Sequence, residues 1–381
     1  MSTTTSSGAY PNPATIPGKQ HILHDHRPVC ILGVGLIGGS MMRDLHACGR
    51  RVFGWDYSAS TVDTINNDGF DASNDPAATL RRAEHEGALV VIATPLPAIG
   101  SVLDLITEHA PTCGITDVAS VKHAVFDEVY TRGMQDRFVG GHPMSGTSHH
   151  GWEASHTGLF AGAPWVVTFD NAPAPAPQQA DHTPTAHDGN HTPPRTMITT
   201  PSNNEHMTPI LHPPHNRWIR EWVSVVNLAY DLGSEVIPAR AQTHDAAVAR
   251  ISHVPHVVAE ALAVAGDNDG ALALSLAAGS FRDGTRVAGS DPALTEAMCT
   301  GNAMEVVRAI EEIQAMLAEA HTTLTATPPT IGNLAHAGYR SRRRYEARTG
   351  QRPVLRVRPG APGWISQLEQ AEHLGARIEI F

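Results

Sequence analysis

The first part of the chain contains short, uninterrupted hydrophobic runs that alternate with longer segments of mixed polarity. The runs are PVCIL at 28–32, RVFGWD at 51–56, ALVVIATP at 88–95, GITDVAS at 114–120, FVGGHP at 138–143 and PWVVTFD at 164–170. Apolar runs of this length predict buried strands, and most of the segments between them have the length of a helix. Strands that alternate with helices indicate an α/β fold with a doubly wound parallel sheet. We therefore predict one such domain over residues 27–170.

A helical period replaces these runs after residue 216. Trp218, Trp222, Val225, Val226 and Ala229 recur at spacings of three and four, which places them on one helix face. Residues 242–266 and 294–324 show the same spacing. We predict an all-helical substrate and dimerisation domain over residues 216–330. Its long Ala- and Leu-rich helices need cover on both faces, so we expect two copies of the chain to form a homodimer.

Three further segments differ in composition from the rest. Residues 171–215 hold ten prolines and six histidines with almost no large apolar residues, which predicts a flexible insertion. The irregular spacing of those histidines makes metal binding the less favoured alternative. Residues 1–26 are expected to be a disordered N-terminus. Residues 331–381 form a basic C-terminal extension with eight arginines between positions 340 and 358, and its end resembles strand, helix, strand.

Composition and charge argue against several kinds of function. The chain has 381 residues, a net charge of −11 and an isoelectric point near 6.1, which disfavour nucleic acid or an anionic membrane as the main partner. We recognise no secretory signal and no membrane-spanning run. The cysteines form no C-x-x-C pair, so we expect neither a disulfide framework nor a metal site; they are Cys30, Cys48, Cys113 and Cys299. We expect a cytoplasmic protein that acts on a small molecule.

Gly33, Gly35 and Gly38 form a G-x-G-x-x-G motif between the first predicted strand and a predicted helix. In this setting the first glycine permits a tight turn, the second lets the backbone approach a pyrophosphate, and the third allows close packing of helix and strand. The start of the helix supplies free N–H groups for the phosphates. The motif therefore predicts a Rossmann-type dinucleotide-binding domain.

Asp56 ends the second predicted strand, at the distance where an acidic residue binds the ribose hydroxyls of the adenosine. A carboxylate there would repel a 2′-phosphate, so we predict NAD rather than NADP as the cofactor. The alternative is that Asp56 only caps a turn. The residues that we assign to NAD are Gly33, Gly35, Leu36, Ile37, Gly38, Asp56, Thr94 and Pro95.

His142 directly follows the apolar run FVGG. Ligands of doubly wound sheets bind beyond the carboxyl ends of the strands, so its imidazole is expected to face the nicotinamide end of the cofactor cleft. An imidazole with a pKa near neutrality can take a proton from a hydroxyl while a hydride leaves the same carbon. On position alone, a purely structural histidine is the alternative.

Six motifs, in order along the chain, resemble the signatures of the TyrA prephenate/arogenate dehydrogenase family. They are GVGLIGGS at 33–40, TDVASVK at 116–122, GGHPMSGT at 140–147, LFAGAPWVV at 159–167, ISHVPHVVAEAL at 251–262 and AAGSFRDGTRVAGSDP at 277–292. The resemblance implies NAD-dependent oxidative decarboxylation of prephenate to 4-hydroxyphenylpyruvate in tyrosine biosynthesis. Arogenate, which would give tyrosine directly, is the alternative substrate.

The resemblance also implies roles for individual residues. His142 corresponds to the catalytic histidine that hydrogen-bonds the C4 hydroxyl of the substrate ring, and Ser120 to the serine that orients it. Arg286 corresponds to the arginine that binds a substrate carboxylate. Independently of the resemblance, Asp283 lies three residues before Arg286 and is expected to orient its guanidinium, with an ordinary surface salt bridge as the alternative. The remaining residues assigned to substrate binding are His256, near the substrate side chain, Ser252 and Thr147.

Pro255 separates His253 from His256 in the predicted helix. Because proline cannot donate a helical hydrogen bond, we expect a kink there that aims both imidazoles. His253 is expected to pack in an interface, while His256 faces the substrate. The histidines around SHVPH favour prephenate over the positively charged side chain of arogenate.

Two rival classes fit the sequence less well. Two-domain β-hydroxyacid dehydrogenases normally carry a catalytic lysine on the helical domain, and residues 216–330 contain no lysine. A non-catalytic, redox-sensing NAD-binding protein would need the glycines and Asp56 but not His142, Ser120 and Arg286 together.

Overall fold

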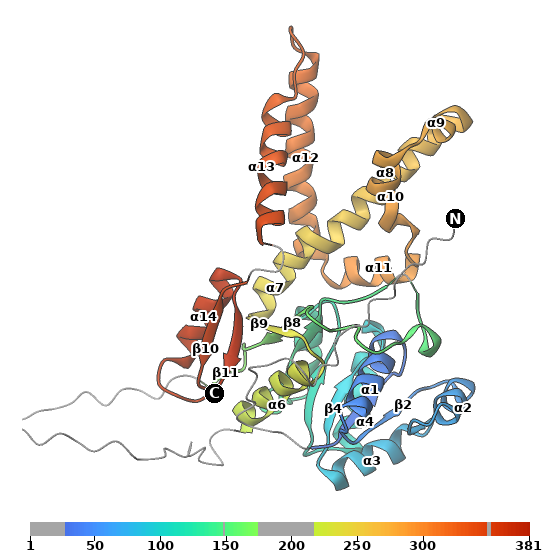
Figure 1. Cartoon of the computed structure of the whole chain (residues 1–381), viewed down its shortest axis with the longest axis vertical. Helices are drawn as coiled ribbons and strands as arrows, with labels where there is room; N and C mark the ends of the chain where they lie inside the picture. Colours follow the sequence, from blue (N-terminus) through green and yellow to red (C-terminus); the bar gives the residue numbers. More distant parts are fainter. Residues whose placement is uncertain (1–26, 148, 174–216, 349–351) are drawn as a thin grey trace, which may run out of the picture.

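The computed structural model describes residues 27–147, 149–173, 217–348 and 352–381. The predictions for residues 1–26 and for most of the insertion at 171–215 concern residues outside these ranges. Figure 1 shows a body of sheets and helices from which two helical arms project, with a small strand–helix–strand unit beside the body. Within the described residues, no helix is both long enough and apolar enough to cross a membrane.

The body is built on a six-stranded parallel sheet with the order β3-β2-β1-β4-β5-β6. The strands are β1 (Val29–Leu32), β2 (Val52–Trp55), β3 (Ala72–Ser73), β4 (Leu89–Ile92), β5 (Gly114–Asp117) and β6 (Phe138–Val139). Every apolar run predicted between residues 28 and 120 forms one of these strands. β3 has only two residues, too few to produce a pattern in the sequence.

Helices cover both faces of this sheet, which confirms the doubly wound fold. Side chains of a strand alternate between its faces: Val29 and Ile31 of β1 join one hydrophobic core, while Cys30 and Leu32 join the other. The first core includes α1 (Leu36–Ala47) and α2 (Ala59–Asn67), and the second includes α3 (Pro76–Glu86), α4 (Ile99–His109) and α5 (His123–Thr131). The strand order reverses between β1 and β4, which is where dinucleotides bind in such sheets.

A second sheet of three strands leads away from the first. It consists of β7 (Gly141–Pro143), β8 (Pro164–Thr168) and β9 (Glu235–Ala239), with β7 antiparallel and β9 parallel to β8. The expectation that the runs at 138–143 and 164–170 belong to the parallel sheet is therefore wrong in detail. Gly140 and Gly141 explain the change of sheet: added Cβ atoms would lie 2.9 Å from the Thr168 hydroxyl and 2.7 Å from the Asp117 carbonyl oxygen.

Residues 217–239 pack with the body, although the sequence pattern assigned them to the helical unit. The helix α6 (Arg217–Asp231) is buried along most of its length and contacts β6, β8 and β9. Trp218 and Trp222 belong to the same hydrophobic core as β1. The helical period was predicted correctly, but periodicity does not show which element a helix packs against.

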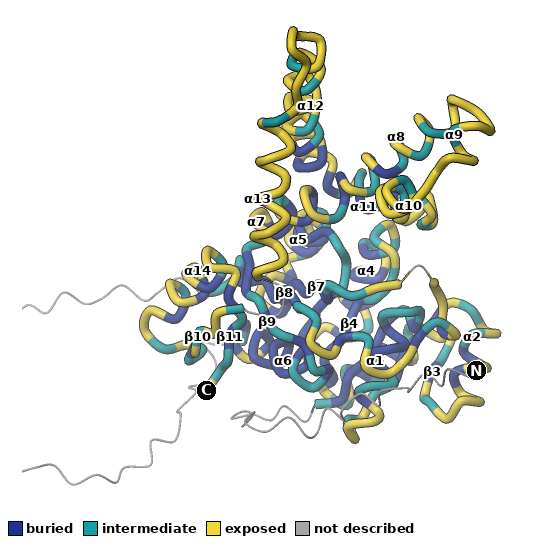
Figure 2. Tube along the Cα trace, turned by 45° about the horizontal axis from the view of Figure 1, so that its top comes forward, coloured by how far each residue is buried: buried dark blue, intermediate teal, exposed yellow. Residues whose placement is uncertain are grey.

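Between residues 241 and 325 the structure consists of helices joined by short connections. Its elements are α7 (Ala241–Val248), the π-helical turn η4 (Ala249–His253), α8 (Val254–Asn268), α9 (Gly270–Leu276), α10 (Gly279–Thr285), the short 3-10 helix η5 (Arg286–Gly289), α11 (Pro292–Gly301) and α12 (Ala303–Thr325). Large parts of both arms are exposed in Figure 2, and their exposed apolar residues include Val264, Leu272, Leu276 and Leu317.

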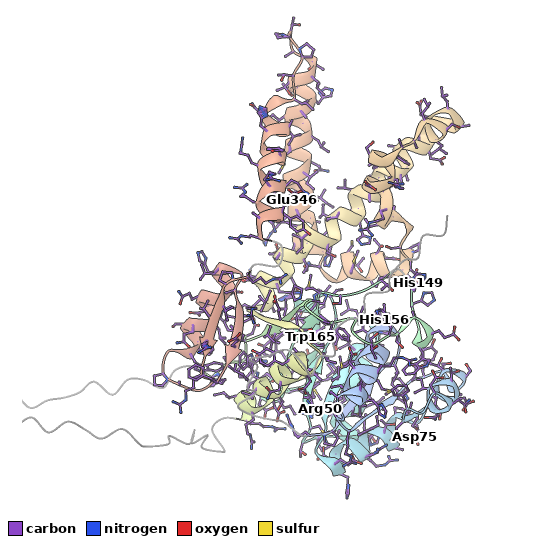
Figure 3. The ribbon with its side chains drawn as sticks, viewed as in Figure 1. Arg50, Asp75, His149, His156, Trp165 and Glu346 are labelled. Carbon is purple, nitrogen blue, oxygen red and sulfur yellow. The ribbon has the colours of Figure 1, made fainter. Side chains whose placement is uncertain are left out.

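The C-terminal residues form a helix followed by the predicted strand, helix and strand. These elements are α13 (Gly332–Arg348), β10 (Val354–Val357), α14 (Trp364–Leu374) and β11 (Arg377–Ile380). Glu346, labelled on α13 in Figure 3, pairs with Arg342 and Arg343 of the same helix, so part of the basic run is neutralised locally. Trp364 packs edge-on against Trp222 of α6, with ring centroids 5.4 Å apart, which attaches the unit to the body.

Candidate functional site

The glycine loop between β1 and α1 shows a different geometric demand at each of its three glycines. Gly33 has a φ of +97°, and a Cβ there would lie 2.8 Å from the Ala93 carbonyl oxygen. A Cβ on Gly38 would lie 2.1 Å from the Gly33 carbonyl oxygen, so close packing excludes any side chain. Gly35 faces open space, with no described atom within 4 Å of an added Cβ. A phosphate group can therefore approach the backbone at Gly35.

The start of α1 provides an anion site next to that open space. Gly35 is the N-cap residue, no side chain caps the helix, and its first turn, which begins with Leu36 and Ile37, contains no acidic residue. The free N–H groups and the positive end of the helix dipole favour a negatively charged ligand. The loop and helix start therefore fit the pyrophosphate of a dinucleotide.

Asp56 lies directly after β2 and is buried. One carboxylate oxygen accepts a hydrogen bond from the backbone N–H of Val34 at 3.1 Å, and the other accepts one from the N–H of Ser58 at 3.0 Å. Asp56 thus stabilises a turn and also contacts the glycine loop. Each oxygen retains a lone pair that a ribose hydroxyl could use.

Thr94 and Pro95 follow β4 on the other side of the glycine loop. The Thr94 nitrogen would lie 3.0 Å from a Cβ on Gly33. The Thr94 hydroxyl oxygen is buried without a hydrogen-bond partner in the described part of the chain. Pro95 leads into the 3-10 helix η2 (Leu96–Ala98), where Leu96 would contact a Cβ on Gly301 of α11. The helical part of the chain therefore reaches the cofactor side of the sheet.

Ser120 and His142 come after β5 and β6, as Gly33 and Thr94 come after β1 and β4. Because the strands are parallel, all four residues lie at the carboxyl edge of one sheet. Ser120 is partly buried and forms no side-chain hydrogen bond with the residues that the structure describes. The structure thus brings the predicted cofactor residues and the predicted catalytic residues to the same edge.

A buried ion pair anchors the strand that carries His142. The Lys122 ammonium donates to the Asp117 carboxylate and, at 2.6 Å, to the Gly141 carbonyl oxygen. Asp117 also accepts from the backbone N–H groups of Gly141 at 3.2 Å and Ala119 at 3.0 Å. Burial raises the pKa of Asp117 and lowers the pKa of Lys122, while their mutual attraction opposes both changes. The pair joins the end of β5 to β7.

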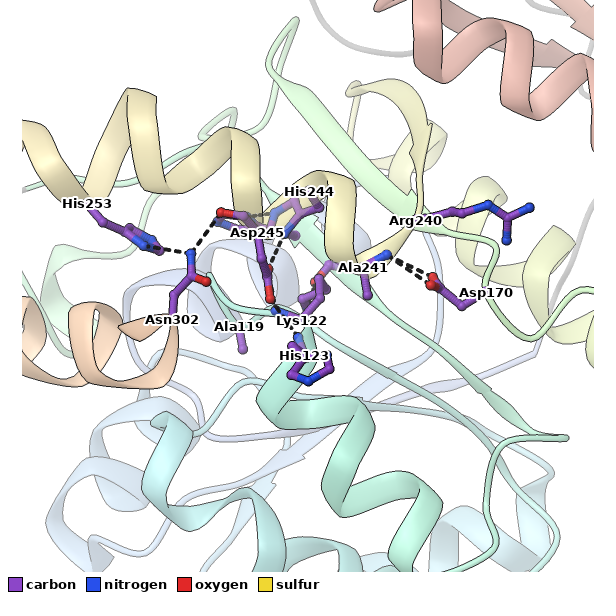
Figure 4. Close-up of polar contacts among 12 residues, drawn as sticks. Ala119, Lys122, His123, Asp170, Arg240, Ala241, His244, Asp245, His253 and Asn302 are labelled. Atoms are coloured by element: carbon purple, nitrogen blue, oxygen red, sulfur yellow. Dashed lines mark hydrogen bonds and ion pairs between the residues drawn. The ribbon is translucent and has the colours of Figure 1, made fainter. Parts of the chain in front are cut away.

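His142 lies in β7 and hydrogen-bonds to a second histidine from the helical part. Its Nδ1 is 2.8 Å from Nε2 of His244 on α7, and Nδ1 of His244 is 2.7 Å from the Asp245 carboxylate. Asp245 also accepts from the backbone N–H groups of Lys122 and His123, both at 2.8 Å, as Figure 4 shows. The sequence contained one signal for this group, an adjacent His-Asp pair at the start of a helix, but the signal alone is weak.

Electrostatics within this group favour a neutral His142 beside an ionised Asp245. Partial burial lowers the pKa of His142 well below its ordinary value, and the nearby His244, Lys122 and His253 lower it further. Burial by itself would raise the pKa of Asp245. Hydrogen bonds from His244 and from the backbone of His123 and Lys122 outweigh burial and lower it.

The histidines on the helical side lie at a change in helix type. The π-helical turn η4 contains Ser252 and ends at His253, and Pro255 occupies the first turn of α8, so the predicted irregularity lies directly before the proline. His253 is fully buried, its Nδ1 is 3.2 Å from the Asn302 amide nitrogen, and burial lowers its pKa to about 4. Nδ1 of His256 is buried and has no hydrogen-bond partner among the described residues.

Arg286, Asp283 and Thr147 are less closely integrated. Arg286 lies exposed in η5, which packs against α8, and within the described ranges it forms no ion pair. Asp283 pairs with Arg282 at 3.5 Å, so the expectation that it orients Arg286 is not met. Thr147 lies in an exposed loop after β7, where its hydroxyl accepts from the His149 N–H at 3.2 Å. None of the three is hydrogen-bonded to His142.

Comparisons with known proteins match both halves of the chain. A model of the nucleotide-binding domain of prephenate dehydrogenase matches residues 41–180. A model of the prephenate dehydrogenase dimerization domain matches residues 240–335. The first match includes His142, and the second includes His244, to which His142 is hydrogen-bonded.

Individual relatives are similar over most of this chain. A solved structure from Corynebacterium glutamicum, described as a candidate prephenate dehydrogenase, is 51% identical with a TM-score of 0.80, and the match covers 93% of this chain and 99% of that one. Synechocystis arogenate dehydrogenase is 25% identical with a TM-score of 0.60, over 84% of this chain and 99% of that one. The prephenate dehydrogenase of Bacillus subtilis is 26% identical over 296 residues, which span 74% of this chain and 66% of the Bacillus protein.

Proposed function

The chain belongs to the prephenate dehydrogenase family, and we propose that it catalyses the NAD-dependent oxidative decarboxylation of prephenate to 4-hydroxyphenylpyruvate. The observation that carries this proposal is the position of His142. It follows the carboxyl edge of a nucleotide-binding sheet and is hydrogen-bonded to a residue of the region that matches the dimerization domain. In this proposal the base, His142, lies beside the edge of the sheet at which the dinucleotide binds.

The cofactor is held by the elements that surround the open space at Gly35. The N–H groups at the start of α1 bind the pyrophosphate, and Asp56 binds the ribose and disfavours a 2′-phosphate. Thr94 and Pro95 line the loop opposite. When bound, NAD⁺ supplies the acceptor for the hydride that leaves C4 of the substrate.

His142 acts as the general base, because its lowered pKa keeps the imidazole neutral at neutral pH. It takes the proton of the C4 hydroxyl while the hydride leaves, so that C4 becomes a carbonyl carbon. The C1 carboxylate then leaves as CO₂, its bonding electrons enter the ring, and the ring becomes aromatic. The C4 oxygen is then a phenolate, which can recover the proton from His142. Aromatisation makes the sequence effectively irreversible.

Three of the substrate-binding residues, Arg286, Ser252 and His256, come from the helical part, and Ser120 and Thr147 come from loops after β5 and β7. Arg286 binds a substrate carboxylate, a task for which the guanidinium is suited because it can donate two parallel hydrogen bonds. Ser120 orients the C4 hydroxyl, and Ser252, His256 and Thr147 contact the rest of the substrate. The unpartnered Nδ1 of His256 supports its place in this set.

Arogenate is the second candidate substrate, and one residue favours it. Glu260 follows His256 by one helical turn on α8 and is partly buried, so its carboxylate could pair with the ammonium of arogenate. Prephenate has a keto group at that position, which a histidine N–H can bind. We retain prephenate because this part of the helix carries two histidines, His253 and His256, against one carboxylate, Glu260.

Two copies of the chain form the functional unit in this proposal. The match to a dimerization domain and the exposed apolar residues of α8, α9 and α12 support a homodimer. The cytoplasmic location expected from the sequence stays a prediction.

The proposal is tested by NADH formation with purified full-length protein. Prephenate and arogenate are compared, each with NAD⁺ and with NADP⁺, and the rate is followed by absorbance. We expect the highest kcat/KM with prephenate and NAD⁺. The variant His142→Asn should lose most of its turnover, roughly 10²-fold or more, while its affinity for NAD⁺ changes little. Absence of NADH with both substrates would contradict the proposal, and higher kcat/KM for arogenate would move it to the second candidate.

A further inference from the structure

We propose that His244 and Asp245 are positioning residues that hold His142 in the tautomer whose Nε2 carries a free lone pair. This inference rests on the proposed function, since it concerns how the base is kept ready. It adds two residues from α7, neither of which contacts the cofactor loop. Two hydrogen bonds lead from Asp245 through His244 to His142.

The first step is the fixed position of the Asp245 carboxylate. Its two oxygens accept from the backbone N–H groups of Lys122 and His123, both at 2.8 Å, across the boundary between the helices and the sheet. The carboxylate is almost fully buried, so water cannot replace these donors. An ionised carboxylate can only accept hydrogen bonds. Whatever approaches it from His244 must therefore be a donor.

The second step fixes the tautomer of His244. Its Nδ1 lies 2.7 Å from an Asp245 oxygen, so this nitrogen carries the proton. In the neutral imidazole the other nitrogen, Nε2, then has no proton and can only accept. This ring is almost fully buried as well, so its orientation is set by these contacts.

The third step transmits this preference to His142. Its Nδ1 lies 2.8 Å from Nε2 of His244 and must donate, so the proton of neutral His142 is on Nδ1. Nε2 of His142 then has a free lone pair, and it forms no hydrogen bond with the described residues. A general base needs this lone pair to receive the hydroxyl proton. After transfer, the imidazolium keeps its Nδ1–H donation to His244, and the Asp245 charge stabilises it through that ring.

The helix α7 is itself held at several points, so the two residues cannot easily turn away. The Asn302 amide donates to the Asp245 carbonyl oxygen at 2.8 Å. At the start of α7, the backbone N–H of Ala241 donates to Asp170 at 3.0 Å, and that of Arg240 donates to Glu372 of α14 at 2.8 Å. These contacts come from three separate parts of the chain, as Figure 4 shows for Asn302 and Asp170.

The first measurement needs no variant. Long-range ¹⁵N–¹H correlation spectra of the full-length protein, with ¹⁵N-labelled histidine, report which ring nitrogen carries the proton; His142 is identified by its absence in His142→Asn. Above the pKa of His142, the proposal expects a protonated Nδ1 and an unprotonated Nε2. The opposite tautomer would overturn the proposal, even if the enzyme is active.

The variant Asp245→Asn should reverse the direction of both hydrogen bonds that link Asp245, His244 and His142. The amide oxygen can still accept from the His123 N–H, while the amide nitrogen takes the place of the oxygen that binds Lys122 and His244. That nitrogen gives up the Lys122 hydrogen bond, donates to Nδ1 of His244 and moves the His244 proton to Nε2. His142 would then accept at Nδ1 and carry its proton on Nε2, where it blocks base function. We expect the tautomer signature of His142 to invert and kcat to fall by roughly 10²–10⁴-fold, by analogy with serine proteases. Unchanged kcat in a folded variant would contradict the proposal.

Asp170→Asn is the matched control, because its amide oxygen can still accept from the Ala241 N–H and keep α7 in place, and the side chain does not touch either imidazole. It should leave the His142 tautomer and kcat within a few-fold of the unmodified protein. His244→Phe, which keeps a ring but removes both nitrogens, should leave His142 as a mixture of tautomers and serves if Asp245→Asn does not fold. If the unmodified protein forms no NADH from either substrate, the proposed function fails. The spectrum still shows whether His244 and Asp245 hold the proton of His142 on Nδ1.

Discussion

At the scale of single residues, the site depends on buried polar groups that hold one another. Lys122 and Asp117 fix the backbone of Gly141, next to His142, and Asp245 binds two backbone N–H groups and an imidazole. An unpaired buried charge costs several kcal/mol of folding free energy, roughly, so each of these groups needs its partner. His142 is therefore fixed at two points: the backbone of the neighbouring Gly141 is bound by Lys122 and Asp117, and the imidazole is bound by His244.

The pH dependence of the reaction should reflect the environment of His142. The base works only when it is neutral, so kcat/KM falls as the pH drops through its pKa in the free enzyme. Burial, His244, Lys122 and His253 lower that pKa, which displaces the acidic limb below the ordinary value of 6.5. We expect initial rates of NADH formation to remain on the plateau at pH 6.5. An acidic limb centred at or above this value would contradict the described environment.

The hydrophobic pattern points to His142 and Asp56, because each lies at the end of a predicted strand, where ligands bind in this fold. Ser120, and the catalytic role of His142, come from the resemblance to a known family. Neither the pattern nor the resemblance identified His244 and Asp245. These residues lie 102 and 123 positions from their partners His142 and Lys122, and only the packing of α7 on the sheet brings them together. Linear order contains no information on that packing. The roles of Arg286 and Thr147 stay predictions.

At the scale of elements, the glycine loop combines two opposite requirements. At Gly33 and Gly38 the chain itself fills the space of a side chain, whereas at Gly35 the space is open. The first two positions therefore serve the packing of β1, β4 and α1. The open space at Gly35 is the one that we propose for the pyrophosphate.

Two alanine variants should separate these requirements. Gly35→Ala fits the protein, because φ is −87° and nothing lies within 4 Å, but its methyl group occupies the approach to the backbone. We expect the KM for NAD⁺ to rise roughly ten-fold or more, with an unchanged midpoint of thermal unfolding. Gly38→Ala places Cβ 2.1 Å from a carbonyl oxygen and should reduce the free energy of unfolding by about 1–3 kcal/mol.

Gly338→Ala on the exposed helix α13 is the control for both variants, since an added Cβ there also meets nothing within 4 Å. It should leave the KM unchanged and raise the midpoint slightly, because alanine is the better helix former. An unchanged KM in Gly35→Ala would remove this loop from the cofactor site.

The strands of the parallel sheet were predictable because buried strands are continuous apolar runs. The break between β6 and β7 was not, because both strands lie within one run, FVGGHP. Its cause is the crowding at Gly140 and Gly141 by Thr168 and Asp117, which belong to other strands. Such crowding is a property of the folded chain.

At the scale of the whole molecule, the C-terminal strand–helix–strand unit is part of the body. Its predicted pattern is confirmed, but its position depends on Trp364, which packs against Trp222 of α6. Glu369 and Glu372 of α14 bind Arg240, the residue before α7. The unit therefore contacts the helix that carries His244 and Asp245. The sequence could not reveal this contact, because Arg240 lies more than 100 residues before Glu369 and Glu372 in the chain.

The most direct test of the central claim is the stoichiometry of the reaction with prephenate. Purified protein, NAD⁺ and prephenate should yield NADH, CO₂ and 4-hydroxyphenylpyruvate in equal amounts, measured by absorbance, manometry and chromatography. His142→Asn should form all three products more slowly by the same factor, because proton removal precedes the loss of CO₂. NADH without CO₂, or products formed by His142→Asn at the unmodified rate, would contradict the claim that His142 is the base of an oxidative decarboxylation.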